Sequence, residues 1–333
     1  MKAFVIDRYG QDVPGRLADI AQPEPGQDEV LVRVHAASVN VLDNRIRSGA
    51  FKKILPYPLP LVLGNDCAGT VVAAGARAQR FQPGAEVYAR LDPKRIGAFA
   101  EYAVVRQDAL ARKPANLDMR EAAALPLVGL TAWQALVEIA GLQAGQRVLI
   151  HAGSGGVGTI AIQLAKYLGA FVATTTGTDN VGWVKELGAD VVIDYRKEDF
   201  TTQLEGYDVV LNSQDKDVLE KSLQVLKPGG HLVSISGPPT PAFAAEQGLS
   251  WPMRLGVRLM SRRIRARAKR RGVHYSFLFM HPDGLQLDKL AALAELGAIR
   301  PVIDRTFPLA QAADALAYVE RGRTKGKVVI TVD

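Results

Sequence analysis

The sequence predicts an α/β protein in which a β-rich domain precedes a doubly wound parallel-sheet domain. The chain of 333 residues is long enough for two domains of ordinary size. Short strand-like runs between Pro and Gly turns fill its first part, and strand-like runs that alternate with helical stretches fill its second. A glycine-rich segment at residues 153–158 joins one of these later strands to a helix.

The first part, up to residue 121, has the pattern of a compact β-rich domain. Residues 29–36 and 69–75 are rich in Val and Ala, and Pro- and Gly-containing turns at 23–26 and 82–85 separate such runs. The N-terminal residues 1–7 are typical of a strand rather than of a signal peptide.

The second part, residues 122–282, begins with a predicted helix at 125–140. Strand-like runs follow at 147–150, 171–175, 191–193 and 209–211, then at 231–236 after the expected turn Lys227-Pro228-Gly229-Gly230, and finally at 276–280. Helical stretches between several of them indicate βαβ units and a parallel sheet. The remaining residues, 283–333, are too few for a domain, with helices expected at 287–296 and 309–321 and a strand at 327–332. We expect this tail to complete the first domain.

Composition limits the protein class. Apolar residues make up 48% of the chain and charged residues 23%, as in globular proteins with a substantial core. The single cysteine, Cys67, excludes disulfides and cysteine-based zinc clusters, and this usage suits a reducing compartment. No apolar run approaches the roughly 18 residues of a membrane span. These features predict a cytoplasmic protein.

The net charge of +7 comes from one segment. Nine Lys or Arg residues lie within 254–271, and without them the chain has 32 basic and 34 acidic residues. Apolar residues recur there at helical spacing, namely Met253, Val257, Met260, Ile264 and Ala268. The segment is either a solvated helix over the cleft or at a dimer contact, or a surface for an anionic membrane. Nucleic acid is disfavoured because no aromatic residues alternate with the basic ones.

Residues 151–158, HAGSGGVG, follow the apolar run 147–150 and open the helical pattern 159–168. In G-x-G-x-x-G, Gly153 permits a tight turn, Gly155 lets the backbone approach a pyrophosphate, and Gly158 lets the helix pack on the strand. The free N–H groups and the positive dipole end of the helix would hold the phosphates. The predicted contacts are Gly153, Ser154, Gly155, Gly156, Val157 and Gly158.

The end of the second strand of this domain indicates the cofactor. NAD enzymes carry an acid there for the ribose 2′-OH, whereas this strand ends in TTTG at 174–177. Asp179 comes too late and is expected to N-cap the helix through residue 187. The Thr175 and Thr176 hydroxyls would suit a 2′-phosphate, unless they belong only to a threonine-rich turn. Because ligands of such sheets bind at the carboxyl ends of strands, we also expect contacts from Asn212, Ser236, Gly237 and Phe279.

Over essentially its whole length the chain resembles the medium-chain dehydrogenase/reductase superfamily, and within it the zinc-independent, zeta-crystallin-like quinone oxidoreductases. The resemblance rests on SVNVLD at 38–43, GNDCAGTV at 64–71, LPLVGLTAW at 125–133, the glycine loop, GAD at 188–190 and IDY at 193–195. It implies a GroES-like catalytic domain, a Rossmann domain, NADPH in the cleft between them, and a homodimer through Rossmann edge strands.

The resemblance also implies site residues. Zinc alcohol dehydrogenases have a cysteine where this chain has Asn40 and a His-Glu pair where it has Asn65-Asp66, and their four-cysteine loop is missing, so we expect no metal. Asn40, Asn65 and Asp66 would instead hydrogen-bond a substrate oxygen, or else only cap turns. Further cofactor contacts implied by the resemblance are Thr131 at the nicotinamide, and Tyr195 and Lys325 at the 2′-phosphate.

The predicted function is therefore NADPH-dependent, zinc-independent reduction of quinones or α,β-unsaturated carbonyls. One alternative is a binding protein that uses residues 254–271 on an anionic membrane or RNA, with weak or no turnover. Another is an enoyl-thioester reductase. Such reductases have a proton-donating tyrosine where this chain has Phe51, with Tyr57 close by, and this difference favours quinones and reactive enones.

Overall fold

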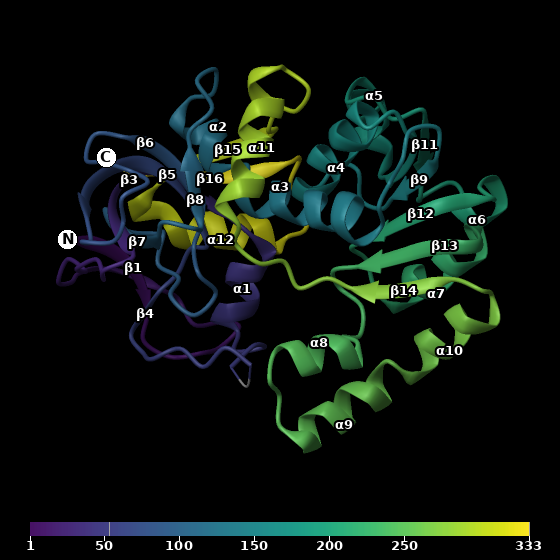
Figure 1. Ribbon diagram of the computed structural model, residues 1–333, viewed down its shortest axis with the longest axis horizontal. Helices are drawn as coiled ribbons and strands as arrows, with labels where there is room; N and C mark the ends of the chain where they lie inside the picture. Colours follow the sequence, from purple (N-terminus) through teal and green to yellow (C-terminus); the bar gives the residue numbers. More distant parts are fainter. Residues whose placement is uncertain (53, 333) are drawn as a thin grey trace. The chain divides into compact units, whose positions relative to one another are not determined.

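The computed structural model describes residues 1–52 and 54–332 and divides the chain into two compact units (Figure 1). Unit 1 comprises Met1–Leu130 and His281–Asp333, and unit 2 comprises Thr131–Met280. The α/β fold class, with a β-rich unit 1 and a parallel sheet in unit 2, confirms the prediction.

Unit 1 is built on antiparallel strands. In its larger sheet the order is β15-β16-β3-β5-β6-β8, with β7 also paired to β3, and a second sheet has the order β2-β1-β4. Its elements are β1 (Lys2–Ile6), β2 (Arg16–Asp19), β3 (Glu29–Val39), α1 (Val41–Arg47), β4 (Leu61–Val62), β5 (Asp66–Ala74), β6 (Glu86–Arg90), β7 (Tyr102–Arg106), β8 (Leu110–Arg112), α2 (Met119–Ala123), α11 (Gly284–Glu295), β15 (Ile303–Pro308), the 3-10 turn η3 (Leu309–Gln311), α12 (Ala312–Glu320) and β16 (Lys327–Thr331). The helix α3 (Pro126–Trp133) crosses from unit 1 into unit 2.

The C-terminal tail belongs to unit 1 because β16 pairs antiparallel with β3, with Val328 opposite Val39. This pairing places the start of β16 beside the end of β3. The sequence pattern missed β15, which pairs parallel with β16. The β15 side chains are all half-buried or exposed, so this strand lacks the buried apolar face that identifies strands from sequence.

Unit 2 is a six-stranded parallel sheet with the order β11-β10-β9-β12-β13-β14 (Figure 1). This is the doubly wound dinucleotide-binding topology, in which the strand order reverses beside the first strand, β9. Its elements are the π-helix η1 (Gln134–Ile139), β9 (Arg147–Ile150), α4 (Gly156–Tyr167), β10 (Phe171–Thr176), the 3-10 turn η2 (Thr178–Asn180), α5 (Val181–Glu186), β11 (Val191–Asp194), α6 (Phe200–Gln203), β12 (Tyr207–Asn212), α7 (Lys216–Val225), β13 (Leu226–Ser234), α8 (Pro241–Glu246), α9 (Trp251–Met260), α10 (Arg262–Arg270) and β14 (His274–Phe277).

Two local expectations in unit 2 are wrong. The turn expected at 227–230 lies within β13, because the register against β12 shifts between Tyr207 and Val209 and accommodates the extra residues as a bulge. Asp179 caps no helix: it lies inside η2, whose N-cap is Gly177, and its side chain is 81% exposed.

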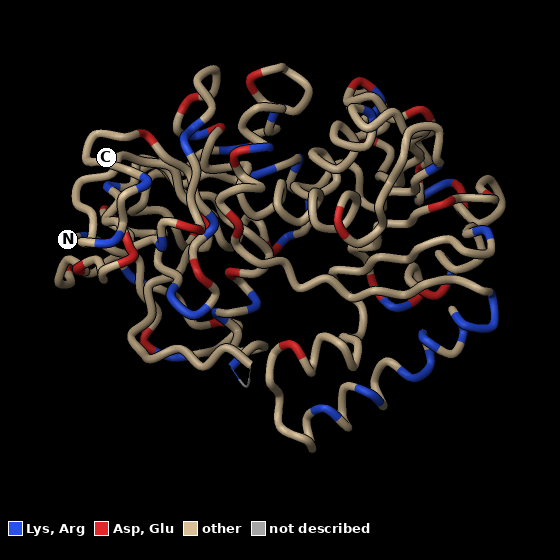
Figure 2. Tube along the Cα trace, in the orientation of Figure 1, with Lys and Arg blue, Asp and Glu red and all other residues tan. Residues whose placement is uncertain are grey.

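The basic segment forms two helices rather than one. The helical conformation is interrupted at Ser261, between α9 and α10. Figure 2 shows Lys and Arg recurring along both helices. Ile264 and Ala268 are buried in the unit 2 core, which also contains side chains of α6, α7 and the sheet. Met260, expected on the same apolar stripe, is 64% exposed, because the break at Ser261 turns it away from that core.

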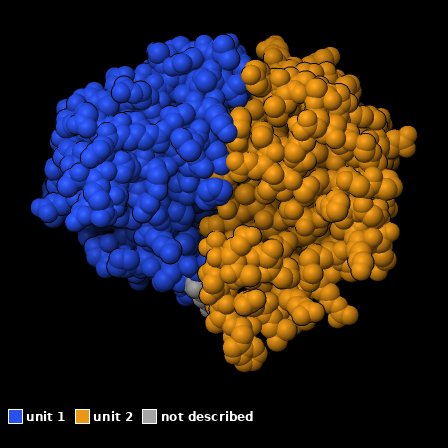
Figure 3. Space-filling view, viewed as in Figure 1, with its two compact units in different colours: residues 1–130, 281–333 blue, residues 131–280 orange. Residues whose placement is uncertain are grey.

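Figure 3 colours the two units, and the chain passes from one to the other after residues 130 and 280. The expected domain boundaries were after 121 and 282. Among the described residues no helix has both the length and the apolar character needed to cross a membrane.

Candidate active site

The glycine loop of unit 2 lies between the end of β9 and the start of α4. A Cβ added to Gly153 would overlap the Thr174 hydroxyl, and one added to Gly158 would overlap the Ala152 carbonyl oxygen. A Cβ on Gly155 would meet nothing nearer than 3.4 Å. The first and third glycines are therefore needed for packing, whereas the second leaves space in front of the loop.

The helix that follows this loop begins without a side-chain cap. Gly155 is the N-cap of the 12-residue helix α4, and it offers no side chain to the first N–H groups. Ser154, Gly156 and Val157 are all half-buried, so their backbone remains partly accessible. Uncapped N–H groups at the positive end of a helix bind pyrophosphate oxygens well.

Two buried polar atoms near the carboxyl edge of this sheet have no hydrogen-bond partner in the described part of the chain. They are the Thr176 hydroxyl at the end of β10 and the Asn212 amide nitrogen at the end of β12. The Asn212 oxygen accepts from Ser234 (3.1 Å) and Ser236 (3.2 Å), which fixes the orientation of the amide. Burying an unpaired donor costs about 1–3 kcal/mol, so both atoms suit a ligand with oxygens at this edge.

Thr175 differs from Thr176. Its hydroxyl lies 3.1 Å from Nδ1 of His151 and accepts from the Ala152 N–H at 3.3 Å. Burial lowers the pKa of His151 to about 3, so this imidazole is a neutral structural group. Of the two predicted threonines, only Thr176 keeps an unengaged hydroxyl.

A cation lies where the sequence pattern showed none. Tyr195 and Arg196 follow β11, and a Cβ built on Gly177 would lie 3.5 Å from the Tyr195 hydroxyl and 3.6 Å from Nε of Arg196. Nη1 of Arg196 is 3.9 Å from the Asp179 carboxylate, so the arginine offsets the negative charge of Asp179. The sequence signal was a basic residue directly after Tyr195, in the turn that follows β11, rather than in the loop after Thr176 at the end of β10.

The other expected cofactor contacts are less informative. The Gly237 N–H donates to the Ser234 hydroxyl (2.9 Å), and the Phe279 ring packs against Phe243 at 5.6 Å between centroids. Thr131 is buried in α3. Lys325 lies in unit 1, where its side chain is exposed and its backbone N–H donates to Asp304 (3.0 Å).

In unit 1 the structure brings Asn40, Asn65 and Asp66 into one buried network. The Asp66 carboxylate accepts from Asn40 Nδ2 (3.0 Å) and from the Ser38 hydroxyl (2.8 Å). Asp43 connects the asparagines, since it accepts from the Asn40 N–H (2.7 Å) and from Asn65 Nδ2 (2.6 Å). Asn40 is 5% exposed, and Asn65 and Asp66 are fully buried.

The sequence reasoning missed Lys327, which completes this network. Its side chain is 4% exposed, and its ammonium donates to Oδ1 of Asn40 and to the Val39 carbonyl (3.1 Å). It also lies 3.9 Å from the Asp66 carboxylate. The signal was a lysine that opens the buried run Val328–Ile330, where a charge is rare unless it is paired.

Burial changes the acidity of these groups. It raises the pKa of Asp43 to about 6, against the opposing bonds from Asn40 and Asn65. It also raises the pKa of Asp66, against the nearby Lys327 charge, and lowers the pKa of Lys327, against the two carboxylates. The network thus combines two buried aspartates with the Lys327 ammonium, and the buried Arg90 guanidinium adds a second positive charge near both carboxylates.

Among the described residues, no three His, Cys, Asp or Glu side chains are grouped so that they could hold a metal ion. The donors of the unit 1 network also do not suit zinc. Amide oxygens are poor ligands for it, and the Lys327 ammonium would repel a dication.

Two family models match the chain. Residues 26–115 match the alcohol dehydrogenase GroES-like domain, and residues 187–330 match the zinc-binding dehydrogenase model. The chain is 36% identical to the mitochondrial NAD(P)H oxidoreductase RTN4IP1 of Danio rerio, over all of this chain and 91% of that protein. It is 36% identical to the chloroplastic NADPH-dependent alkenal/one oxidoreductase of Arabidopsis thaliana, over 99% of this chain and 79% of that one.

Solved structures agree with these similarities. The structure of the quinone oxidoreductase from Coxiella burnetii superimposes with a TM-score of 0.87 at 33% identity, covering all of this chain and 99% of that one. An alcohol dehydrogenase superfamily protein from Novosphingobium aromaticivorans gives a TM-score of 0.85 at 33% identity, with both chains fully covered.

Proposed function

The chain belongs to the quinone oxidoreductase family of the medium-chain dehydrogenase/reductase superfamily, and from this premise we propose that it is an NADPH-dependent, zinc-independent reductase of quinones and α,β-unsaturated carbonyls. The observation that carries the cofactor choice is Arg196 beside Tyr195 at Gly177, where NAD enzymes place an acid.

When bound, NADPH supplies the hydride for the reaction. The residues of unit 2 bind and orient it. The loop around Gly155 and the N-terminus of α4 hold the pyrophosphate, and Thr176 and Asn212 offer their unpaired polar atoms along the sheet edge. The Arg196 guanidinium and the Tyr195 hydroxyl hold the 2′-phosphate. Because a cation pairs with a phosphate dianion, this contact gives NADPH a higher affinity than NADH, whose ribose carries no phosphate.

The unit 1 network supports the substrate side. In zinc-dependent relatives a metal supplies positive charge where this chain has Asn40, Asn65 and Asp66. Here Lys327 provides a buried positive charge and fixes the Asn40 amide by donating a hydrogen bond to its Oδ1. A preorganised charge of this kind stabilises an oxygen on which negative charge develops. Lys327 is a positioning residue in this proposal, since Asn40 and Asp66 are its direct contacts.

The structure favours quinones and enones over enoyl thioesters. Thioester reductases of the superfamily use a tyrosine as proton donor, and Tyr57 is the phenol near the corresponding segment. Burial raises the pKa of Tyr57 to about 12, and its hydroxyl donates to the Pro93 carbonyl. A committed phenol of this kind is a poor proton donor, whereas a reduced quinone oxygen can take its proton from water.

The direct test is a cofactor titration followed by an electrophile panel. Purified protein is titrated with NADPH and NADH, and oxidation of the preferred nucleotide is then followed with quinones, 2-alkenals, enones and an enoyl thioester. We expect NADPH oxidation with the first three classes. A protein that oxidises neither nucleotide with any of them is not this reductase.

We propose two further properties. A homodimer through β14 is supported by the position of β14 at the edge of the unit 2 sheet, and light scattering tests it. A cytoplasmic location is supported by the single buried Cys67, although the relatives include mitochondrial and chloroplastic proteins. Cell fractionation tests that location.

A further inference from the structure

Helix α9 presents an apolar face to solvent. Trp251, Leu255 and Leu259 are 76%, 49% and 60% exposed, and their spacing of four residues places them on one side of the helix. Val257, on the opposite side, is buried. The sequence pattern had identified only the inward stripe through Val257, so this second, outward stripe is a finding of the structure.

The cations of the same segment are largely unpaired. Glu220 is the acid that pairs with it, and Arg263 and Arg267 share that carboxylate. The remaining cations that form no ion pair within residues 1–52 and 54–332 are Arg254, Arg258, Arg262, Arg265, Lys269, Arg270 and Arg271. No aspartate or glutamate occurs in the sequence between Glu246 and Asp283 to neutralise them.

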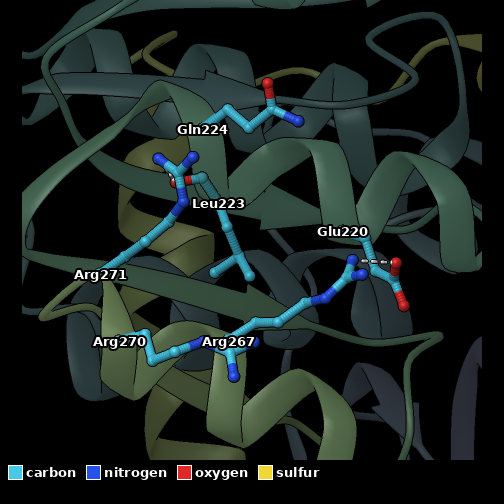
Figure 4. A pocket seen from close by; sticks show the side chains of 6 residues that line it. All are labelled: Glu220, Leu223, Gln224, Arg267, Arg270 and Arg271. Atoms are coloured by element: carbon cyan, nitrogen blue, oxygen red, sulfur yellow. Dashed lines mark hydrogen bonds and ion pairs between the residues drawn. The ribbon is translucent and has the colours of Figure 1, made fainter.

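Three cations of the segment, one of them paired with Glu220, gather at one groove. A groove of about 350 Å³ between α7 and α10 is lined by Arg267, Arg270 and Arg271, with Glu220 at one end (Figure 4). Arg267 pairs with Glu220, and Arg271 donates to the Leu223 carbonyl at 3.4 Å. Arg270 has neither kind of partner in the described chain, so the groove keeps an excess of positive charge.

We propose that α9 and α10, together called the α9–α10 arm (251–271), form a docking surface for an anionic lipid bilayer. An exposed stripe of Trp and Leu flanked by Arg is the composition of helices that lie in the membrane interface. The apolar stripe would enter the headgroup boundary, and the unpaired cations would face lipid phosphates.

Charge and composition favour lipid over the other occupants. Two copies of the arm meeting face to face would bring their unpaired cations together, which disfavours self-association. Nucleic acid would use the cations but not the apolar stripe, and Trp251 is the single aromatic residue of the arm available for stacking. A bilayer with anionic headgroups uses both features.

The arm is preformed rather than disordered before binding. Ile264 and Ala268 fix α10 in the unit 2 core, and α9 directly precedes α10, with only Ser261 between the two helices. Docking therefore needs little ordering of the chain, so little of the binding free energy is lost to conformational entropy. This inference concerns binding alone and stands independently of the proposed reductase activity.

The first experiment tests the cations by co-sedimentation with phosphatidylcholine vesicles and with phosphatidylcholine/phosphatidylglycerol vesicles. We expect binding to the anionic vesicles only, weakened by salt. The arm variant R262A/K269A/R270A should lose about fivefold in partitioning per charge, or of the order of 100-fold in total. The matched control R8A/K94A/R112A removes three exposed cations elsewhere and should retain binding. Equal losses in both variants would mean that net charge alone acts, and the proposal would be wrong.

The second experiment tests the apolar stripe. The variant W251S/L255S/L259S should lose more than about tenfold in vesicle binding, because it removes the exposed apolar area that docking would bury in the membrane. The control L285S/L296S changes two equally exposed leucines outside the arm. Circular dichroism verifies that each variant is folded. The proposal would be overturned if the stripe variant bound vesicles as well as the wild type does. It would also be overturned if the protein bound RNA more tightly than vesicles, or if the stripe substitutions only dissociated a dimer.

Discussion

The ammonium of Lys327 donates a hydrogen bond to Oδ1 of Asn40, which lies 287 residues earlier in the chain. The contact exists because β16 pairs with β3 and places the start of one strand beside the end of the other. Through this contact Asn40 and Lys327 form one buried ionic network with Asp66. This network lies in unit 1 and the cofactor cradle in unit 2, so substitutions can probe them separately.

Lys327→Met should destabilise unit 1 by about 3–5 kcal/mol, because it removes the ammonium that lies 3.9 Å from the buried Asp66 carboxylate. Adding Asp66→Asn should restore part of that loss, since the uncompensated charge is then gone. Chemical denaturation of the single and double variants measures this coupling. Lys325→Met, which alters an exposed lysine two residues away, should change stability by less than about 0.5 kcal/mol. Purely additive effects of Lys327→Met and Asp66→Asn would contradict the network.

Because Lys327 positions the Asn40 amide for the substrate oxygen in this proposal, its loss should lower kcat while the KM for NADPH stays unchanged. The expected fall in kcat is about 10- to 100-fold, smaller than for a direct oxyanion donor. Steady-state kinetics of Lys327→Met and Lys327→Arg, measured where both are folded, provide the comparison. Arg should retain more activity because it keeps the charge. A parallel rise in the KM for NADPH would indicate a general structural defect instead.

Asp43 should make part of the stability dependent on pH. Its pKa is about 6 in the folded protein, above that of an unfolded aspartate, so the folded state binds the proton more tightly. The resulting stabilisation is complete below about pH 4 and is lost as the pH rises through 6. Between pH 7 and pH 5 the wild type should therefore gain about 1 kcal/mol relative to Asp43→Asn. Urea unfolding of both proteins at the two pH values measures this difference, and a constant difference would refute it.

Arg196→Ala should weaken NADPH binding by about 10- to 100-fold, the loss expected for a charge-assisted bond to phosphate, and leave NADH binding unchanged. The neighbouring Lys197→Ala is the matched control, because Lys197 pairs with Asp194 rather than lying at Gly177. Fluorescence titration of each nucleotide measures the affinities. Equal losses for NADPH and NADH would show that Arg196 does not read the 2′-phosphate.

Two glycines of the loop should respond differently to alanine. Gly155→Ala should fold normally, since its nearest neighbour atom lies 3.4 Å away, but should bind NADPH more weakly because the methyl group occupies the approach of the pyrophosphate. Gly158→Ala should lower the thermal stability even without nucleotide, because its Cβ overlaps the Ala152 carbonyl. Thermal melts with and without NADPH separate the two effects. A loss of stability in Gly155→Ala comparable to that of Gly158→Ala would contradict these roles.

The sequence by itself determined the fold class, the family and the cofactor loop. The Gly153–Gly158 spacing between an apolar run and a helical pattern is a local signal, because strand, turn and helix are adjacent in the chain. The NADPH-dependent reductase class, now supported by the relatives, followed from the spacing of several such local motifs.

Only the tertiary structure decided which side chains meet. Lys327 joins Asn40 through strand pairing across nearly the whole chain, and Arg196 reaches Gly177 from the neighbouring strand. The same holds for Thr176, whose hydroxyl has no partner in the described part of the chain, whereas that of Thr175 contacts His151. Patterns of apolar residues specify which face of an element is buried, whereas charge pairing and hydrogen bonding between distant elements depend on register, which sequence periodicity does not encode.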